Sequence, residues 1–126
     1  MSSKYFLERS IGIEIELTGI TRNKAAKVIA EHFQGTVEKK YDSNISYNIK
    51  TPDSRVWKVV YDGSIRTQKK VNGQRVEASK EYSVEIVSPI LNYNKDIKDL
   101  QELVRKIRKA GGFSEKQNCT GIHYLK

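Results

Sequence analysis

Two glutamates placed two residues apart are the first groups in this sequence that could do chemistry. Glu14 and Glu16 lie in segment 10–18, where isoleucine and leucine alternate strictly with other residues. This period of two predicts a β-strand with one apolar face, so both carboxylates project from the opposite face, about 7 Å apart. Neighbouring carboxylates repel each other unless a cation lies between them, and Mg²⁺ prefers oxygen ligands. The pair could therefore bind a metal ion, or it could simply line a solvated face.

Three later segments carry further polar groups that could join such a site. Asp62 and Ser64 flank a glycine directly after a predicted strand, Glu85 lies within another predicted strand, and His123 follows a polar loop. Taken singly, these are an ordinary turn, an exposed glutamate and an isolated histidine. Their order along the chain is more informative than any one of them.

The remaining pattern predicts an α+β domain. Apolar stripes predict helices at 22–34 and 94–110, with Thr21 and Asn94 as their N-caps. Asn72-Gly73 predicts an exposed β-hairpin. Strands are predicted at 10–18, on either side of a turn at 41–44, and at 56–62, 81–88 and 122–125. Hairpin signals among the middle strands favour a mainly antiparallel sheet with both helices packed on one face.

The charge of the chain is strongly positive. Lys and Arg number 23 against 15 Asp and Glu, a formal net charge of +8 over 126 residues. Such a surplus favours an anionic partner such as a nucleotide or RNA, or it forms a solvated basic surface. The basic candidates lie around the predicted hairpin and at the end of the second helix: Arg66, Lys69, Lys70, Arg75, Lys80, Arg105 and Lys109.

The sequence favours a cytoplasmic protein. Cys119 is the only cysteine, so no internal disulfide can form, which is typical of a reducing compartment. No apolar run approaches the length needed to span a membrane, and the N-terminal segment lacks the apolar centre of a signal peptide. We therefore expect no membrane partner.

Four segments together resemble the amidoligase family, whose fold is similar to that of glutamine synthetase and glutamate–cysteine ligase. They are Gly12 to Glu16, Trp57 to Ser64, Glu85 to Leu91 and Asn118 to His123. The resemblance implies half of a carboxylate–amine ligase fold. It also implies an ATP- and Mg²⁺-dependent enzyme that phosphorylates a carboxylate and lets an amine displace the phosphate, giving an amide. Its partners would be a nucleotide and an amine and carboxylate substrate pair.

The resemblance assigns roles to individual residues. Glu14 and Glu16 match a first metal-binding pair, and Glu85 matches a later strand glutamate expected to bind metal. Asp62 and Ser64 match an Asp-Gly-Ser element expected to take part in catalysis.

His123 matches the first histidine of a Gly-x-His-x-His motif, expected to act in catalysis and to lie near the nucleotide. Two departures from the family pattern are visible: Leu125 replaces the second histidine, and the sequence ends at Lys126 where family members continue for roughly as long again. We therefore expect a single amidoligase-like domain over 1–126 that is truncated relative to the family and performs ligation only if a complete site can form.

The main alternative is a non-catalytic amidoligase fold reused as a basic binding module. Such a module, for example a phage-encoded inhibitor of the anti-CRISPR type, would contact RNA or a nucleoprotein through the basic residues given above. We also expect a homo-oligomer, because an open sheet edge invites pairing. A nucleic-acid-binding domain unrelated to ligases is less favoured, since no aromatic-interleaved binding motif is visible.

Overall fold

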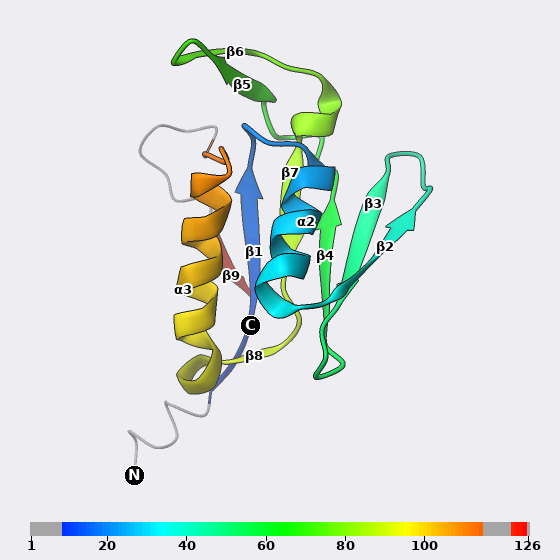
Figure 1. The fold of residues 1–126 in the computed structure, drawn as a ribbon, viewed down its shortest axis with the longest axis vertical. Coiled ribbons are helices and arrows are strands. Elements are labelled where there is room, and N and C mark those ends of the chain that lie inside the picture. Colours follow the sequence, from blue (N-terminus) through cyan, green and yellow to red (C-terminus); the bar gives the residue numbers. More distant parts are fainter. Residues whose placement is uncertain (1–8, 115–121, 126) are drawn as a thin grey trace.

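The computed structural model describes residues 9–114, together with the backbone of residues 122–125. Within these residues, seven strands form one sheet in which each pairing is antiparallel. Two helices lie side by side on one face of that sheet, and a two-stranded hairpin stands at one end (Figure 1). The predicted α+β class and the arrangement of the helices are confirmed.

The strand order is β2-β3-β4-β7-β1-β8, with β9 also paired to β1. The strands of the sheet are β1 (Ser10–Leu17), β2 (Thr36–Lys40), β3 (Ser46–Lys50), β4 (Val56–Val60), β7 (Val84–Val87), β8 (Leu91–Asn92) and β9 (Ile122–Leu125). The hairpin consists of β5 (Gln68–Val71) and β6 (Gln74–Glu77). The helices are α2 (Arg22–Phe33) and α3 (Tyr93–Lys109), with a 3₁₀ turn, η1 (Lys80–Tyr82).

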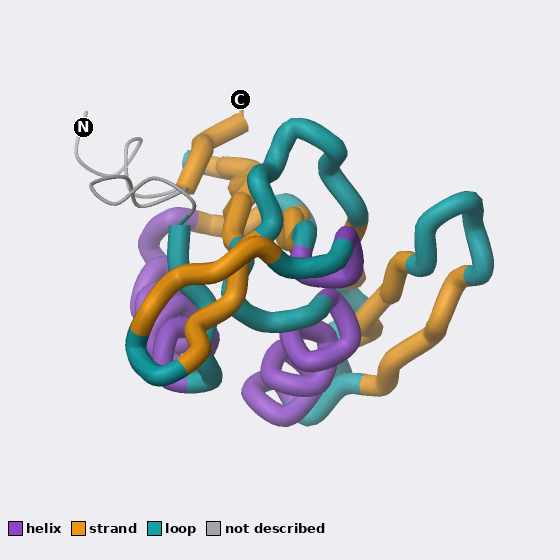
Figure 2. The backbone as a smooth tube through the Cα atoms, turned by 90° about the horizontal axis from the view of Figure 1, so that it is seen from above, coloured by secondary structure: helices purple, strands orange, loops and turns teal. Residues whose placement is uncertain are grey.

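The two faces of the sheet differ in chemistry. One face packs against both helices and forms a single core, whose members include Ile13, Ile15, Leu17, Ile49, Trp57, Val59, Val84, Ile86, Ala25, Ile29, Leu100 and Leu103. Complete burial of one such aliphatic side chain contributes about 1.5–3 kcal/mol, so this face holds the helices in place. Among the described residues, no helix lies on the other side of the sheet, which we call the open face (Figure 2).

Both helices begin at a polar cap. Thr21 caps α2 as predicted, since its hydroxyl accepts a hydrogen bond from the Lys24 N–H at 3.1 Å. The cap of α3 is Asn92 rather than the predicted Asn94: its side-chain oxygen accepts the Lys95 N–H at 3.0 Å, and the helix starts directly after it. Within the described residues, neither helix is long and apolar enough to cross a membrane.

The strand predicted at 81–88 is shorter than expected. Lys80–Tyr82 forms η1, and the strand β7 begins only at Val84. Glu81 therefore lies in η1 and not on the same strand as Glu85, contrary to the predicted strand at 81–88.

Arg22 explains this turn, which sequence periodicity could not anticipate. Its Nη1 donates hydrogen bonds to the carbonyls of Lys80 and Ser83, both at 2.9 Å, and its Nε donates to the carbonyl of Ile45 at 2.7 Å. The guanidinium also lies over the Tyr61 ring, 5.5 Å from its centroid. One buried side chain thus ties three separate segments to the start of α2.

The predicted Asn72-Gly73 hairpin is confirmed. The two residues have φ values of 52° and 79°, the positive angles that a tight hairpin turn requires. Gln68 joins the hairpin to the end of β1, because its carbonyl accepts the Gly19 N–H at 3.0 Å and its N–H donates to Thr18 Oγ1 at 2.9 Å. The hairpin is therefore anchored two residues beyond Glu16.

Edge pairing is discouraged at β2, which is the outer strand on one side of the sheet. Its exposed side chains include Glu38, Lys39 and Lys40. Charged side chains on an edge strand disfavour pairing with another chain. The expected homo-oligomer stays a prediction.

Candidate metal centre on the open face

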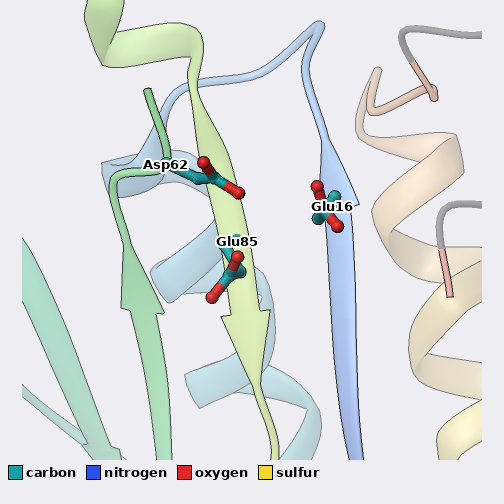
Figure 3. Close-up of side chains that lie close together, drawn as sticks. All are labelled: Glu16, Asp62 and Glu85. Atoms are coloured by element: carbon teal, nitrogen blue, oxygen red, sulfur yellow. The ribbon is translucent and has the colours of Figure 1, made fainter. Parts of the chain in front are cut away.

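Three carboxylates from three different strands or strand ends meet on the open face. One oxygen each of Glu16, Asp62 and Glu85 lies within 4.8 Å of the others. Figure 3 shows the three side chains beside one another, on the side of the sheet turned away from α2. All three residues are half-buried.

The sheet register explains why these residues meet. Glu16 on β1 is directly opposite Glu85 on β7, and Val60 on β4 is opposite Glu85 on its other side. Directly opposite residues share a face and have Cβ atoms about 4.5–5.5 Å apart. Asp62 follows Val60 by two residues, just beyond the end of β4, and so continues along the same face.

Asp62 is held in one conformation by two serines. The Ser64 N–H and hydroxyl donate to Asp62 Oδ1 at 2.9 and 2.7 Å. The buried Ser83 hydroxyl donates to the Asp62 carbonyl at 2.7 Å and accepts the Asp62 N–H at 3.0 Å. The hydrogen bonds from Ser64 lower the pKa of Asp62, so this carboxylate is ionised and aimed at the cluster.

The pKa of Glu85 is raised by its half-buried position among these acids. Burial, hydrogen bonds with Asp62 and Glu14, and the negative charges of those two groups raise the pKa of Glu85 to about 8. Without a cation, a proton held on Glu85 reduces the repulsion within the cluster.

The donor set suits a small hard cation. Mg²⁺ binds oxygen atoms at about 2.0–2.1 Å, so two oxygens on one ion are separated by at most about 4.2 Å. Carboxylate oxygens within 4.8 Å of one another can approach such spacings by rotation of their side chains. The residues present therefore fit such an ion.

The remaining predicted site residues lie close to this cluster. Glu14 projects from the open face opposite Val87 and contributes a hydrogen bond to Glu85, but it is not one of the three carboxylates that gather within 4.8 Å. His123 is paired with Glu14 in the backbone register between β9 and β1. The His123 side chain lies outside the described residues, so its predicted role stays a prediction.

Sequence reasoning missed the part that Asp62 and Ser83 play in building the cluster. The role in catalysis that the resemblance assigns to Asp62 stays a prediction, and its position two residues after Val60 places it beside the two glutamates. Ser83 gave no signal, because its contact with Asp62 links residues 21 positions apart.

Residues 7–124 match the family described as "putative amidoligase enzyme". The chain belongs to this amidoligase family. The match runs from before β1 into β9, and so includes each of the clustered carboxylates and His123. No curated protein and no solved structure matches the chain.

Family membership confirms the resemblance seen in the sequence and supports a ligase-like function in general terms. Among the described residues, no helix covers the face of the sheet that carries the acidic cluster (Figure 2). Convergent polar groups are one feature of small-ligand sites.

Proposed function

We propose that this amidoligase binds Mg²⁺ through Glu16, Asp62 and Glu85 and uses it to bind ATP for the joining of a carboxylate and an amine. The observation that carries the proposal is the convergence of three carboxylate oxygens within 4.8 Å, in a chain that matches the amidoligase family over residues 7–124. Ligation would occur wherever a complete site for both substrates forms.

In this proposal the residues of the chain act mainly by position and charge. Bound Mg²⁺ would neutralise the charge of the nucleotide phosphates and of the transferring phosphoryl group. Glu16, Asp62 and Glu85 hold the ion, and Ser64 keeps Asp62 ionised and oriented toward it. Glu14 lies beside Glu85 and supports the same centre. His123, opposite Glu14 in the register, is proposed to contact the nucleotide or the reacting groups.

Direct titration with Mg²⁺ and then with ATP tests the proposal. We expect calorimetric Mg²⁺ binding by the wild-type chain, ATP binding that depends on Mg²⁺, and about tenfold weaker Mg²⁺ binding by Glu16→Gln, which loses one charged ligand. Glu102→Gln removes the same charge from an exposed position on α3 and should leave binding unchanged. Absence of Mg²⁺ binding to the wild type, or equal affinity in Glu16→Gln, would refute the metal centre.

A second candidate function is the binding of RNA or a nucleoprotein. The position of the basic hairpin beside the basic end of α3 favours it. Lys70 and Arg75 are paired across the hairpin, and both lie over the Phe113 ring, at 5.4 and 4.2 Å from its centroid. Arg75 also donates to the Ser114 carbonyl at 3.2 Å. The hairpin thus lies over the end of α3 (Figure 2).

Further cations lie beside this contact. The last turn of α3 carries Lys106, Arg108 and Lys109. Lys106 and Lys109 line a groove of about 340 Å³ together with Lys24 of α2. We call these residues, with Lys70 and Arg75, the basic end. Of the other predicted contacts, Arg66 forms an ion pair with Glu77 at 2.7 Å, whereas Lys69, Lys80 and Arg105 are exposed.

If the basic end binds RNA, the affinity should fall as the salt concentration rises. Lys70→Glu combined with Lys109→Glu should weaken binding to single-stranded RNA and reduce the slope of log K against log salt by roughly 0.7 for each lost phosphate contact. Fluorescence anisotropy over a salt series measures both quantities. Lys40→Glu on the outer strand β2 is the matched control. Equal slopes for the double variant and the control would argue against this second function.

A further inference from the structure

We propose that Lys58 binds the anionic group that the metal centre presents, either the phosphate chain of the nucleotide or the carboxylate of the substrate. The inference rests on the proposed function, because it names the anion-binding part of the same site. Its starting observation is an exposed lysine on the open face, one row away from the clustered acids Glu16 and Glu85.

The register places Lys58 on the open face. On β4, Trp57 and Val59 are buried in the core, 1% and 0% exposed, so Lys58 between them projects from the other side. Lys58 is directly opposite Val87 of β7, and Val87 is directly opposite Glu14 of β1. Lys58 therefore lies in the same row of the sheet as Glu14, which neighbours the cluster.

Sheet geometry gives the separation between Lys58 and the metal centre. Lys58 precedes Val60 by two residues on β4, and Val60 is directly opposite Glu85 on β7. With strands about 4.8 Å apart and a rise of about 3.4 Å per residue, the Cα atoms of Lys58 and Glu85 are about 8 Å apart. A flexible four-carbon side chain can carry its ammonium group over much of that distance.

The Lys58 ammonium group is not neutralised by a neighbouring acid among the described residues. Within the described residues it makes no ion pair, although Glu14 and Glu85 share its face. Val87 lies between Lys58 and Glu14 in the same row, and Val60 follows Lys58 by two residues on β4. A phosphate or carboxylate bound to the metal ion would lie over these two valines, beside the Lys58 side chain.

Strand β3 carries further hydrogen-bond donors beside Lys58. Asn48 of β3 is directly opposite Lys58, and Lys50 lies one row further along the same face, opposite Val56. The half of the open face formed by β3 and β4 thus offers an amide and two ammonium groups. Lysine is a compact cation that binds phosphate or carboxylate oxygens as a point charge.

The test compares the wild type with Lys58→Met and Lys58→Arg in two steps. Mn²⁺ binding, followed by electron paramagnetic resonance, should be nearly the same in all three proteins, because Lys58 is not a metal ligand. ATP and L-glutamate are then titrated separately onto the Mn²⁺-loaded proteins. We expect Lys58→Met to bind one of them about tenfold more weakly, and Lys58→Arg to retain most of the affinity.

The outcomes separate the two proposals. Loss of ATP affinity in Lys58→Met identifies the phosphate chain as the ligand of Lys58, and loss of glutamate affinity identifies the carboxylate. Equal affinity of Lys58→Met and wild type for both probes overturns the role of Lys58, as does Mn²⁺ binding by the wild type without affinity for either probe. A wild type that binds no Mn²⁺ overturns the metal centre and this inference together. Lys40→Met, on β2, serves as the control for removal of a surface charge.

Discussion

Glu85→Gln is expected to stabilise the metal-free protein at about pH 8 and, at the same time, to abolish most of its Mg²⁺ binding. The wild-type side chain is half-buried next to Asp62 and Glu14, which raise its pKa, with burial, to about 8. Glutamine keeps a similar shape and can still hydrogen-bond these neighbours. It carries no charge, so it removes the repulsion and also removes one metal ligand.

The sign of the pH dependence follows from proton linkage. The folded protein retains the Glu85 proton up to about pH 8, whereas an unfolded chain releases it near pH 4.5. Between these values the folded state binds more protons, so the free energy of unfolding of the wild type falls as pH rises and levels off above about pH 8. Asp53 and Asp62 have lowered pKa values, so they change the free energy of unfolding only at more acidic pH.

Thermal unfolding of the two metal-free proteins over a pH series measures this effect. We expect Glu85→Gln to raise the free energy of unfolding at pH 8 by about 1–2 kcal/mol. This is less than the full pKa shift would give, because solvent screens this partly exposed group. This corresponds to a melting temperature about 5 °C higher for Glu85→Gln at pH 8 and no difference near pH 4. Parallel pH profiles for both proteins would contradict a shared proton in the cluster.

Mg²⁺ binding gives a second, independent measurement of whether Glu85 holds a proton. Below about pH 8 the ion must displace the Glu85 proton, so the apparent Mg²⁺ affinity of the wild type should rise about tenfold per pH unit. Calorimetry in buffers of different ionisation enthalpy should detect the released proton. Glu85→Gln should release none and bind at least about tenfold more weakly, whereas Glu102→Gln should match the wild type in both respects.

The elements that the sequence predicted correctly are those that local patterning specifies. The alternation of Ile13, Ile15 and Leu17 with Glu14 and Glu16 defined both faces of β1, because the period of a strand and the burial of aliphatic side chains leave no other arrangement. Asn72-Gly73 defined the hairpin for a similar reason, since few residues accept positive φ at both positions.

The parts of the site that the sequence did not reveal depend on pairing between distant segments. Asp62 joins the cluster because β4 pairs with β7 in a register that aligns Val60 with Glu85. That register was not visible in either strand alone. Lys58 could have been assigned to the open face from its position between Trp57 and Val59, but its row relative to Glu14 again required the pairing across β7.

Arg22→Leu is expected to lower the free energy of unfolding by about 3–4 kcal/mol, because it leaves three backbone carbonyls without their donor. The guanidinium binds the carbonyls of Ile45, Lys80 and Ser83 and is 6% exposed. Burial lowers the pKa of Arg22 from its usual value, and Tyr47, Tyr61 and Glu81 oppose that shift. Arg22→Lys should lose less, since an ammonium group can reach some of the same carbonyls. Urea unfolding gives these differences, with Lys27→Leu, exposed on the same helix, as the control.

The same residue should influence the metal centre that it does not touch. Arg22 fixes Ser83, and the Ser83 hydroxyl holds the backbone of Asp62 through two hydrogen bonds. If this connection orients Asp62, Arg22→Lys should weaken Mg²⁺ binding several-fold under conditions where the variant remains fully folded. Unchanged Mg²⁺ affinity in folded Arg22→Lys would restrict Arg22 to stability. It would also mean that Ser64, through its two hydrogen bonds to the Asp62 carboxylate, orients that side chain without help from Arg22.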